Sequence, residues 1–138
     1  MRHDDCIFCK IANGEIPSAT IYEDDDFRAF LDLNPATRGH ALLVPKDHFA
    51  NLFELDEEHA EKAILRAKKI GSRMKEKLGC DGLNLVQNNG EAAGQTVFHF
   101  HMHLIPRYLD DGNEDKLTWN HAGLSADEIA EIAAKLRM

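Results

Sequence analysis

Three histidines near the end of the chain alternate with apolar residues, in the order His99-Phe100-His101-Met102-His103. Successive side chains of a β-strand point to opposite faces, so this alternation predicts a strand with all three imidazoles on one face. Neighbours on that face lie about 6.6 Å apart at Cα, which separates the outer two by roughly 13 Å. Two imidazoles could share a metal ion, but a third would be left for nucleophilic or proton-transfer chemistry. The strand alone supports either a metal site or covalent catalysis.

The segment before this strand, residues 88–96, is small, polar and rich in glycine. Glycine lets backbone N–H groups approach an oxyanion closely, and Asn88, Gln95 and Thr96 add neutral donors. An Asn-Gly pair is also a common turn signal, so by itself the segment is equally typical of a hairpin loop. Next to the histidines it indicates a phosphate-binding loop.

These two segments together resemble the signature of the histidine triad (HIT) superfamily. Residues 94–106 resemble its histidine motif, and residues 7–17, 30–35 and 39–48 resemble its upstream segments in the same order. The likeness runs from about Cys6 to Arg107 and is greatest to the small bacterial Hint-like branch. It implies a nucleotide-binding hydrolase or transferase that acts at the α-phosphorus of a nucleoside monophosphate ester or amide.

The resemblance implies catalytic roles for four side chains. His101 would attack phosphorus and form a nucleotidyl-imidazole intermediate that water then cleaves, which splits one difficult substitution into two easier ones. His103 and Thr96 would assist departure of the leaving group, and His40 would line the same pocket. Asp32 would accept hydrogen bonds from the ribose hydroxyls. The implied phosphate contacts are Asn88, Gly94, Gln95, Thr96 and His103.

The resemblance also implies an apolar slot for the base, with a purine as the expected occupant. Hydrophobic residues of this kind are buried in most folds, so for Ile11 and Phe30 a plain core position is an equally good interpretation. The implied walls are Ile7, Phe8, Ile11, Ile16, Phe30 and Leu33.

Three cysteines are present, and Cys6 and Cys9 form a C-x-x-C pair. No secretory signal or long apolar run is visible, so we expect a cytoplasmic protein, where such a pair indicates metal or redox chemistry. Unlike a thioredoxin motif, the pair neither follows a strand nor opens a long helix. Zinc would need two further ligands, and His48 and His99 are the best candidates, as the resemblance to bacterial relatives with this pair also implies. A closed shell of four ligands favours a structural metal and leaves His101 for phosphate chemistry.

Composition and periodicity predict one domain, residues 1–138, with a motif-bearing core of about 6–108 and a variable C-terminal segment, 109–138. The net charge of −8 argues against a nucleic acid polymer as partner, because phosphate backbones require basic patches. We expect an α+β fold in which a meander-like antiparallel sheet carries a long helix and a C-terminal helix packed on it. The expected helices cover 7–13, 57–78 after the cap Asp56, and a segment opened by a capping box at Ser125; the apolar stripe of the long helix includes Ile64. The expected strands cover 19–23, 27–32, 40–45, 82–88 and 96–105, and the last has Phe98 on its apolar face and ends at Pro106.

The remaining residues of interest receive weaker assignments. His59 is expected to be a solvated helix residue, Cys80 a buried thiol, and His3 has no role. By resemblance, Trp119 is a candidate substrate contact from a partner's tail, His121 lies in the same segment, and the chain is expected to form a homodimer.

The expected function is hydrolysis of nucleoside 5′-phosphoramidates or other AMP-linked compounds, without an organic cofactor or a membrane partner. A dinucleoside polyphosphate hydrolase or a nucleotidyltransferase of the same superfamily would use the same residues. A zinc-stabilised nucleotide- or partner-binding module with little catalysis is another alternative. So is a zinc hydrolase that uses the histidine row as catalytic ligands.

Overall fold

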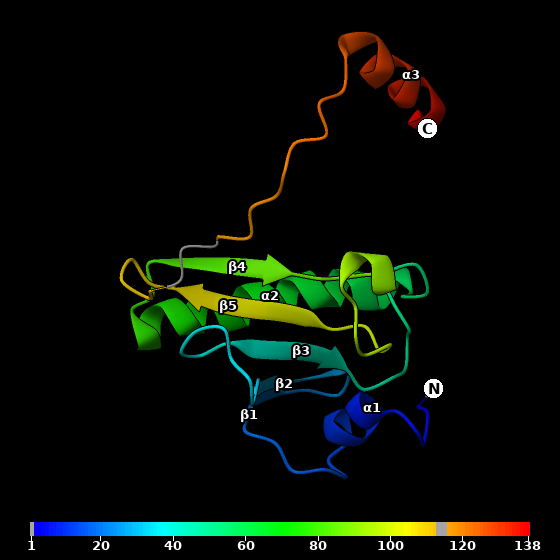
Figure 1. Cartoon of the computed structure of the whole chain (residues 1–138). Helices are drawn as coiled ribbons and strands as arrows, with labels where there is room; N and C mark the ends of the chain where they lie inside the picture. Colours follow the sequence, from blue (N-terminus) through cyan, green and yellow to red (C-terminus); the bar gives the residue numbers. More distant parts are fainter. Residues whose placement is uncertain (1, 113–115) are drawn as a thin grey trace.

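A computed structural model of the chain describes residues 2–112 and 116–138. One antiparallel sheet has the strand order β1-β2-β3-β5-β4, and helices flank it (Figure 1). This confirms the α+β fold. The strands are β1 (Thr20–Glu23), β2 (Phe27–Leu31), β3 (Ala41–Pro45), β4 (Gly82–Val86) and β5 (Met102–Arg107). The helices are α1 (Ile7–Ala12), α2 (Glu57–Leu78), the short 3-10 turn η1 (Glu91–Ala93) and α3 (Ala126–Leu136).

The sheet is not a simple meander, because β5 returns to a place between β3 and β4. Leu42 of β3 pairs with His103, and Leu85 of β4 pairs with Leu104. Burial explains this order: Leu104 and Ile105 are buried, whereas Leu83 and Leu85 of β4 are exposed. Of β5 and β4, the more buried strand takes the inner position and the half-exposed strand forms the edge.

Alternation along β2 and β3 creates two cores, one on each face of the sheet. Ala41 and Leu43 point toward α2 and join a cluster with Phe27, Phe100 and Leu104. The intervening Leu42 and Val44 join Phe8 and Phe30 beneath α1. The face beneath α1 also receives His103, because His103 pairs with Leu42 across the ladder.

Helix α2 has the predicted bounds, and the Asp56 side chain accepts from the His59 backbone N–H as its N-cap. Two expectations about its faces are wrong. His59 is buried rather than solvated, because its ring packs on Phe27 and Phe49 while its Nδ1 bonds Asp56 at 2.8 Å. Ile64, expected in the apolar stripe, is 54% exposed.

The strand expected over 96–105 begins later than predicted, at Met102, and runs through Pro106, which was expected to end it. Residues ahead of Met102 form other hydrogen bonds: Phe100 N–H donates to the Phe49 carbonyl at 2.6 Å. Phe98, expected on the apolar face, is therefore 52% exposed. The three histidines do not share one straight strand, which allows their rings to serve different sites.

Helix α3 has the predicted capping box between Ser125 and Glu128, but it does not pack on the sheet. Figure 1 shows α3 well beyond the β4 edge, and none of its residues is buried. Its apolar residues Ile129 and Ile132 are exposed. The caps are local and form without a partner, whereas an apolar face needs a surface that this chain does not bring to it.

Trp119, in the segment leading to α3, is also exposed, as is His121. Across residues 2–112 and 116–138, we find no helix that combines the length and the apolar character needed to cross a membrane.

Candidate nucleotide and metal sites

His101 lies immediately before β5 and is buried beneath α1, with the Phe8 ring edge-on at 5.0 Å between centroids. Its Nδ1 lies 2.7 Å from the His99 carbonyl oxygen. A carbonyl can only accept, so Nδ1 carries the proton and Nε2 keeps its lone pair. Burial lowers the pKa of His101, which keeps the ring neutral at physiological pH. A neutral imidazole with one committed and one free nitrogen is suited to nucleophilic attack.

A chain of hydrogen bonds fixes the protons of the two neighbouring histidines. The backbone N–H of Ala36 donates to His40 Nδ1 at 2.9 Å, so His40 carries its proton on Nε2. His40 Nε2–H in turn donates to His103 Nδ1 at 2.9 Å, which leaves His103 with its proton on Nε2. Burial, together with His101 and His40, lowers the pKa of His103 to about 4. His103 is therefore a neutral donor next to a neutral nucleophile.

Asp32 adds the carboxylate of this cluster. Its Oδ2 lies 3.6 Å from His40 Nε2, and its charge opposes the lowering of the pKa values of His40, His101 and His103. Positive charge that develops on these rings is therefore stabilised from one side.

A cavity of about 430 Å³ opens over these residues, a size within the range for small-molecule sites. It brings together most of the residues that the sequence singled out. Predicted residues on its wall are Ile7, Phe8, Ile11, Ile16, Phe30, Asp32, Leu33, Asn88, Gly94, Thr96, His101 and His103. Six further residues of the wall were not predicted, namely Pro17, Ser18, Ala19, Leu31, Leu42 and Val97. Of these, Leu42 could have been predicted, because it shares one face of the expected strand 40–45 with His40.

Two predicted residues are not on the cavity wall. His40 lies behind His103 and reaches the cavity only through that side chain. Gln95 is buried, and its amide fastens the loop: Oε1 accepts from the Gly90 N–H, while Nε2 donates to the carbonyls of Ala50 and Val97. The Gln95 side chain thus holds the shape of the 88–96 loop and does not line the cavity.

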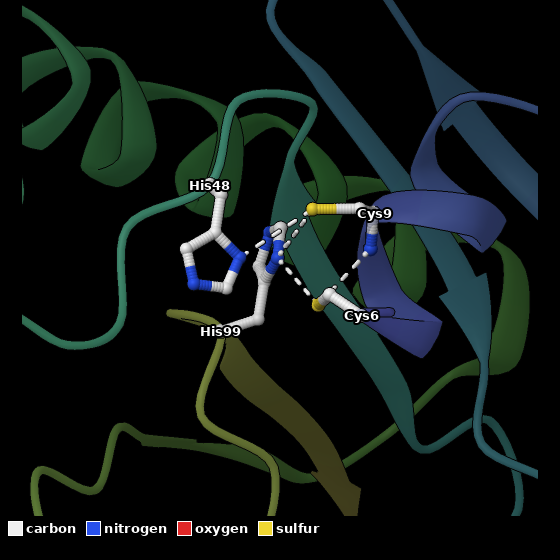
Figure 2. Close-up of side chains that lie close together, drawn as sticks. All are labelled: Cys6, Cys9, His48 and His99. Carbon is white, nitrogen blue, oxygen red and sulfur yellow. Dashed lines mark hydrogen bonds between the residues drawn. The ribbon is translucent and has the colours of Figure 1, made fainter. Parts of the chain in front are cut away.

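Cys6, Cys9, His48 and His99 converge beside this cavity (Figure 2), with one donor atom from each lying within 4.8 Å of the others. His99 Nδ1 lies 3.3 Å from Cys6 Sγ and 3.4 Å from Cys9 Sγ, and His48 Nδ1 lies 3.4 Å from Cys9 Sγ. The donors come from the start of α1, from the chain after β3 and from the segment before β5. The four predicted ligands therefore meet.

The protonation of His99 suits a cation at this point. Its Nε2–H donates to the Pro45 carbonyl at 2.8 Å, so Nδ1 presents a lone pair to the two sulfurs. Burial lowers the pKa of His48, and that of His99 to about 4, so both rings are neutral ligands. Burial raises the pKa of the Cys9 thiol, and a bound cation would reverse this by favouring the thiolate.

Asp32, His40 and His103 form a second group with metal-ligand chemistry and comparable spacing. This group does not fit a cation. A metal on His40 Nε2 would require a proton on Nδ1, where the Ala36 N–H already donates. In the cluster of Cys6, Cys9, His48 and His99, the lone pair of His99 faces the sulfurs, as a metal site requires. In the group of Asp32, His40 and His103, the ring protons instead form a chain of donors, as a proton relay requires.

His3, for which no role was expected, packs against the cluster of Cys6, Cys9, His48 and His99. Its ring stacks on His48 with centroids 3.8 Å apart, and its backbone N–H donates to Cys9 Sγ at 3.3 Å. The Cys6 thiol also accepts from the Cys9 N–H, at 3.4 Å. The residues before α1 thus cover the cluster. Nothing in the sequence around His3 indicated this contact.

The sequence is similar to several curated proteins. It is 49% identical over 105 residues to protein hit of Bacillus subtilis, covering 76% of this chain and 72% of that one. It is 45% identical to the adenosine 5′-monophosphoramidase of Saccharomyces cerevisiae, with 95% and 80% covered. To an adenylylsulfatase of Arabidopsis thaliana it is 42% identical, covering 75% of this chain and 53% of that protein.

Solved structures share the fold along nearly the whole chain. A HIT family protein from Bacillus anthracis has a TM-score of 0.86 at 42% identity, covering 97% of this chain and 96% of that one. A Zn-bound histidine triad family protein from Mycobacterium smegmatis has a TM-score of 0.74 at 34% identity, with 95% and 97% covered. The HIT domain family matches residues 13–110 of this sequence. The chain belongs to the HIT family.

Proposed function

We propose that this protein hydrolyses nucleoside 5′-phosphoramidates or other AMP-linked compounds at the α-phosphorus, through a covalent nucleotidyl intermediate on His101. The observation that carries the proposal is the fixed proton on His101 Nδ1, which leaves Nε2 free within a nucleotide-sized cavity. Two relatives support the substrate class, because one is named as an adenosine monophosphoramidase and the other as an adenylylsulfatase.

In the first step, His101 Nε2 forms a bond to phosphorus while the bond from phosphorus to the leaving group breaks. The ring then holds both the nucleotidyl group and the Nδ1 proton, so it is positively charged. The His99 carbonyl and the Asp32 carboxylate stabilise that charge. The leaving amine takes a proton from His103 Nε2–H, while the hydrogen bond from His40 Nε2–H to His103 Nδ1 stabilises the His103 ring until the second step returns the proton.

In the second step, water attacks phosphorus and the bond from phosphorus to Nε2 breaks. The water gives one proton back to the histidine relay and keeps its oxygen on the released nucleotide, so the enzyme returns to its starting state. The net reaction converts the phosphoramidate and water into the nucleoside monophosphate and the free amine. Asn88, Thr96 and the backbone around Gly94, where φ is +92°, supply neutral donors for the phosphate.

The test compares release of AMP from adenosine 5′-phosphoramidate by the wild type, by His101→Ala and by the matched control His121→Ala, whose side chain is exposed in the tail. We expect His101→Ala to lose at least about a thousandfold in kcat/KM while the control is unchanged. Full activity in folded His101→Ala would refute the nucleophile. Release of a second nucleotide from a dinucleoside polyphosphate, with no phosphoramidate turnover, would instead support a polyphosphate hydrolase.

We propose further that Cys6, Cys9, His48 and His99 hold a structural zinc ion. Two thiols and two neutral imidazoles are a preferred donor set for zinc, and their tetrahedral shell leaves no open position. When bound, zinc would cross-link α1 to the chains that flank β3 and β5. We expect about one zinc per chain by elemental analysis, lost in Cys9→Ser and retained in Cys80→Ser. Equal zinc contents in these two variants would exclude the site.

We also propose a homodimer that extends the sheet across β4. The β4 edge has no neighbouring strand among the described residues, and it exposes Leu83 and Leu85. Unpaired apolar edges of this kind favour pairing with a second strand. Light scattering should give twice the chain mass, and a monomer at micromolar concentration would contradict the proposal.

A further inference from the structure

A second cavity, distinct from the nucleotide cavity, lies between α2 and the β1–β2 end of the sheet. It has a volume of about 310 Å³, and Ile21, Leu31 and Leu78 are among its apolar residues. Ile21 and Leu31 are partly exposed there. We call this hollow the α2 groove. An apolar groove at the edge of a sheet is a surface that a helix can cover.

The rim of the α2 groove is basic, although the chain as a whole carries a charge of −8. Lys69, Arg73 and Lys77 recur every four residues and therefore form one row along α2. Across residues 2–112 and 116–138, we find no ion pair that involves Lys69, Arg73 or Lys77. The rim thus favours an occupant with acidic groups beside an apolar face.

Helix α3 of the same sequence has this combination. Ile129, Ile132 and Leu136 lie on one face with exposed fractions of 55%, 42% and 71%. Glu128, four residues before Ile132, flanks this face, whereas Asp127 and Glu131 lie with Ala134 on the opposite face; the first two turns carry no basic residue. An isolated helix of 11 residues is marginal in water, so an ordered α3 requires a surface to pack on.

The path of the tail indicates whose groove α3 occupies. After β5, the backbone N–H of Leu109 donates to the Asp81 carboxylate at 2.9 Å, which ties the tail to the start of β4. Figure 1 shows the chain then leaving past β4, on the side of the sheet opposite to β1. The α2 groove lies at the β1 edge, so the tail of one chain leads away from its own groove.

We propose that α3 of one chain docks in the α2 groove of a second copy, with Ile129, Ile132 and Leu136 facing the groove. This contact is separate from pairing along β4. It would also brace the nucleotide site from behind, because Leu31 lines both cavities and precedes Asp32. The groove residue Gly39 likewise precedes His40.

The test is hydrogen–deuterium exchange of the α3 backbone amides in the full chain, read by mass spectrometry. In the wild type we expect α3 to exchange at least about tenfold more slowly than an unstructured peptide of the same sequence. Ile132→Asp on the apolar face and Ile21→Asp in the groove should each abolish this protection. Ala134→Asp, on the opposite face of α3, is the matched control and should retain it.

Mixing distinguishes docking in a second copy from docking within one chain. Ile21→Asp retains an intact α3, and Ile132→Asp retains an intact groove. When the two are combined, protection should return to α3 of the Ile21→Asp chain. Absence of this rescue, with protection in the wild type, would show that α3 docks in its own chain and would overturn the proposal. Rapid exchange of α3 in the wild type would also overturn it, whatever the outcome of the activity test.

Discussion

Replacement of His103 with glutamine is expected to make the stability of the protein less sensitive to acid. The pKa of His103 is about 4 in the folded chain and 6.5 in an unperturbed one, because burial and two neighbouring histidines disfavour the charged ring. Between these values the unfolded chain binds a proton that the folded chain does not. The contribution of His103 to the free energy of unfolding is therefore fully present above pH 6.5, and it is lost as the pH falls toward 4.

The size of the effect follows from these two pKa values. A shift of one unit corresponds to about 1.4 kcal/mol, so lowering the pH from 7.5 to 4.5 should remove at most about 2.5 kcal/mol through His103. The ring lines an open cavity, and solvent screening reduces this figure to about 1–2 kcal/mol. Glutamine gains no proton in this pH range, so the free energy of unfolding of the variant should not fall by this amount.

Urea unfolding at four pH values between 7.5 and 4.5 measures this difference. The wild type should lose about 1–2 kcal/mol more than His103→Gln, while His121→Gln, altered in the exposed tail, should follow the wild type. The other acid-sensitive groups, including the four metal-ligand candidates, are common to all three proteins and cancel. Parallel curves for the wild type and His103→Gln would refute the assignment of a half-buried neutral ring.

Three further substitutions test how the elements around the site are held. Gly39→Ala should lower the free energy of unfolding in urea by about 1–3 kcal/mol, because φ is +94° and a Cβ would lie 2.5 Å from Leu78 Cδ1. An unchanged midpoint would argue against this backbone conformation. Asp56→Ala should cost about 1–2 kcal/mol of thermal stability by removing the N-cap of α2, and no loss would mean that another group caps the helix. Leu43→Ala should cost about 2–5 kcal/mol, measured by calorimetry, because the side chain is fully buried beneath α2; a loss below about 1 kcal/mol would contradict that packing.

Local signals in the sequence predicted the helices most accurately. Asp56 and the 3.6-residue period set the bounds of α2, and Ser125 with Glu128 set the start of α3. Each of these signals acts within one or two turns of the chain, so it does not depend on tertiary contacts. The resemblance to the HIT superfamily supplied what periodicity could not, namely which residues from separate segments gather around His101.

Features that depend on distant partners were predicted poorly. The burial of His59 requires Phe27 and Phe49, and the late start of β5 requires bonds to Phe49 and Pro45. The exposure of α3 reflects a surface that is missing from a single chain. In each case the deciding group lies far away in sequence, where alternation and propensity carry no information.

His99 shows why an irregular segment ahead of β5 matters for the whole site. Its ring donates from Nε2 to Pro45 and turns Nδ1 to the sulfurs of Cys6 and Cys9, while its carbonyl accepts the Nδ1 proton of His101. On an ideal strand, His99 and His101 would present their rings side by side, and a carbonyl in the ladder would be taken by a neighbouring strand. Because the segment leaves the ladder before Met102, this carbonyl is free to hold the His101 proton. A shift of the His99 backbone would therefore move both a donor atom of the sulfur cluster and the acceptor on which the free nitrogen of His101 depends.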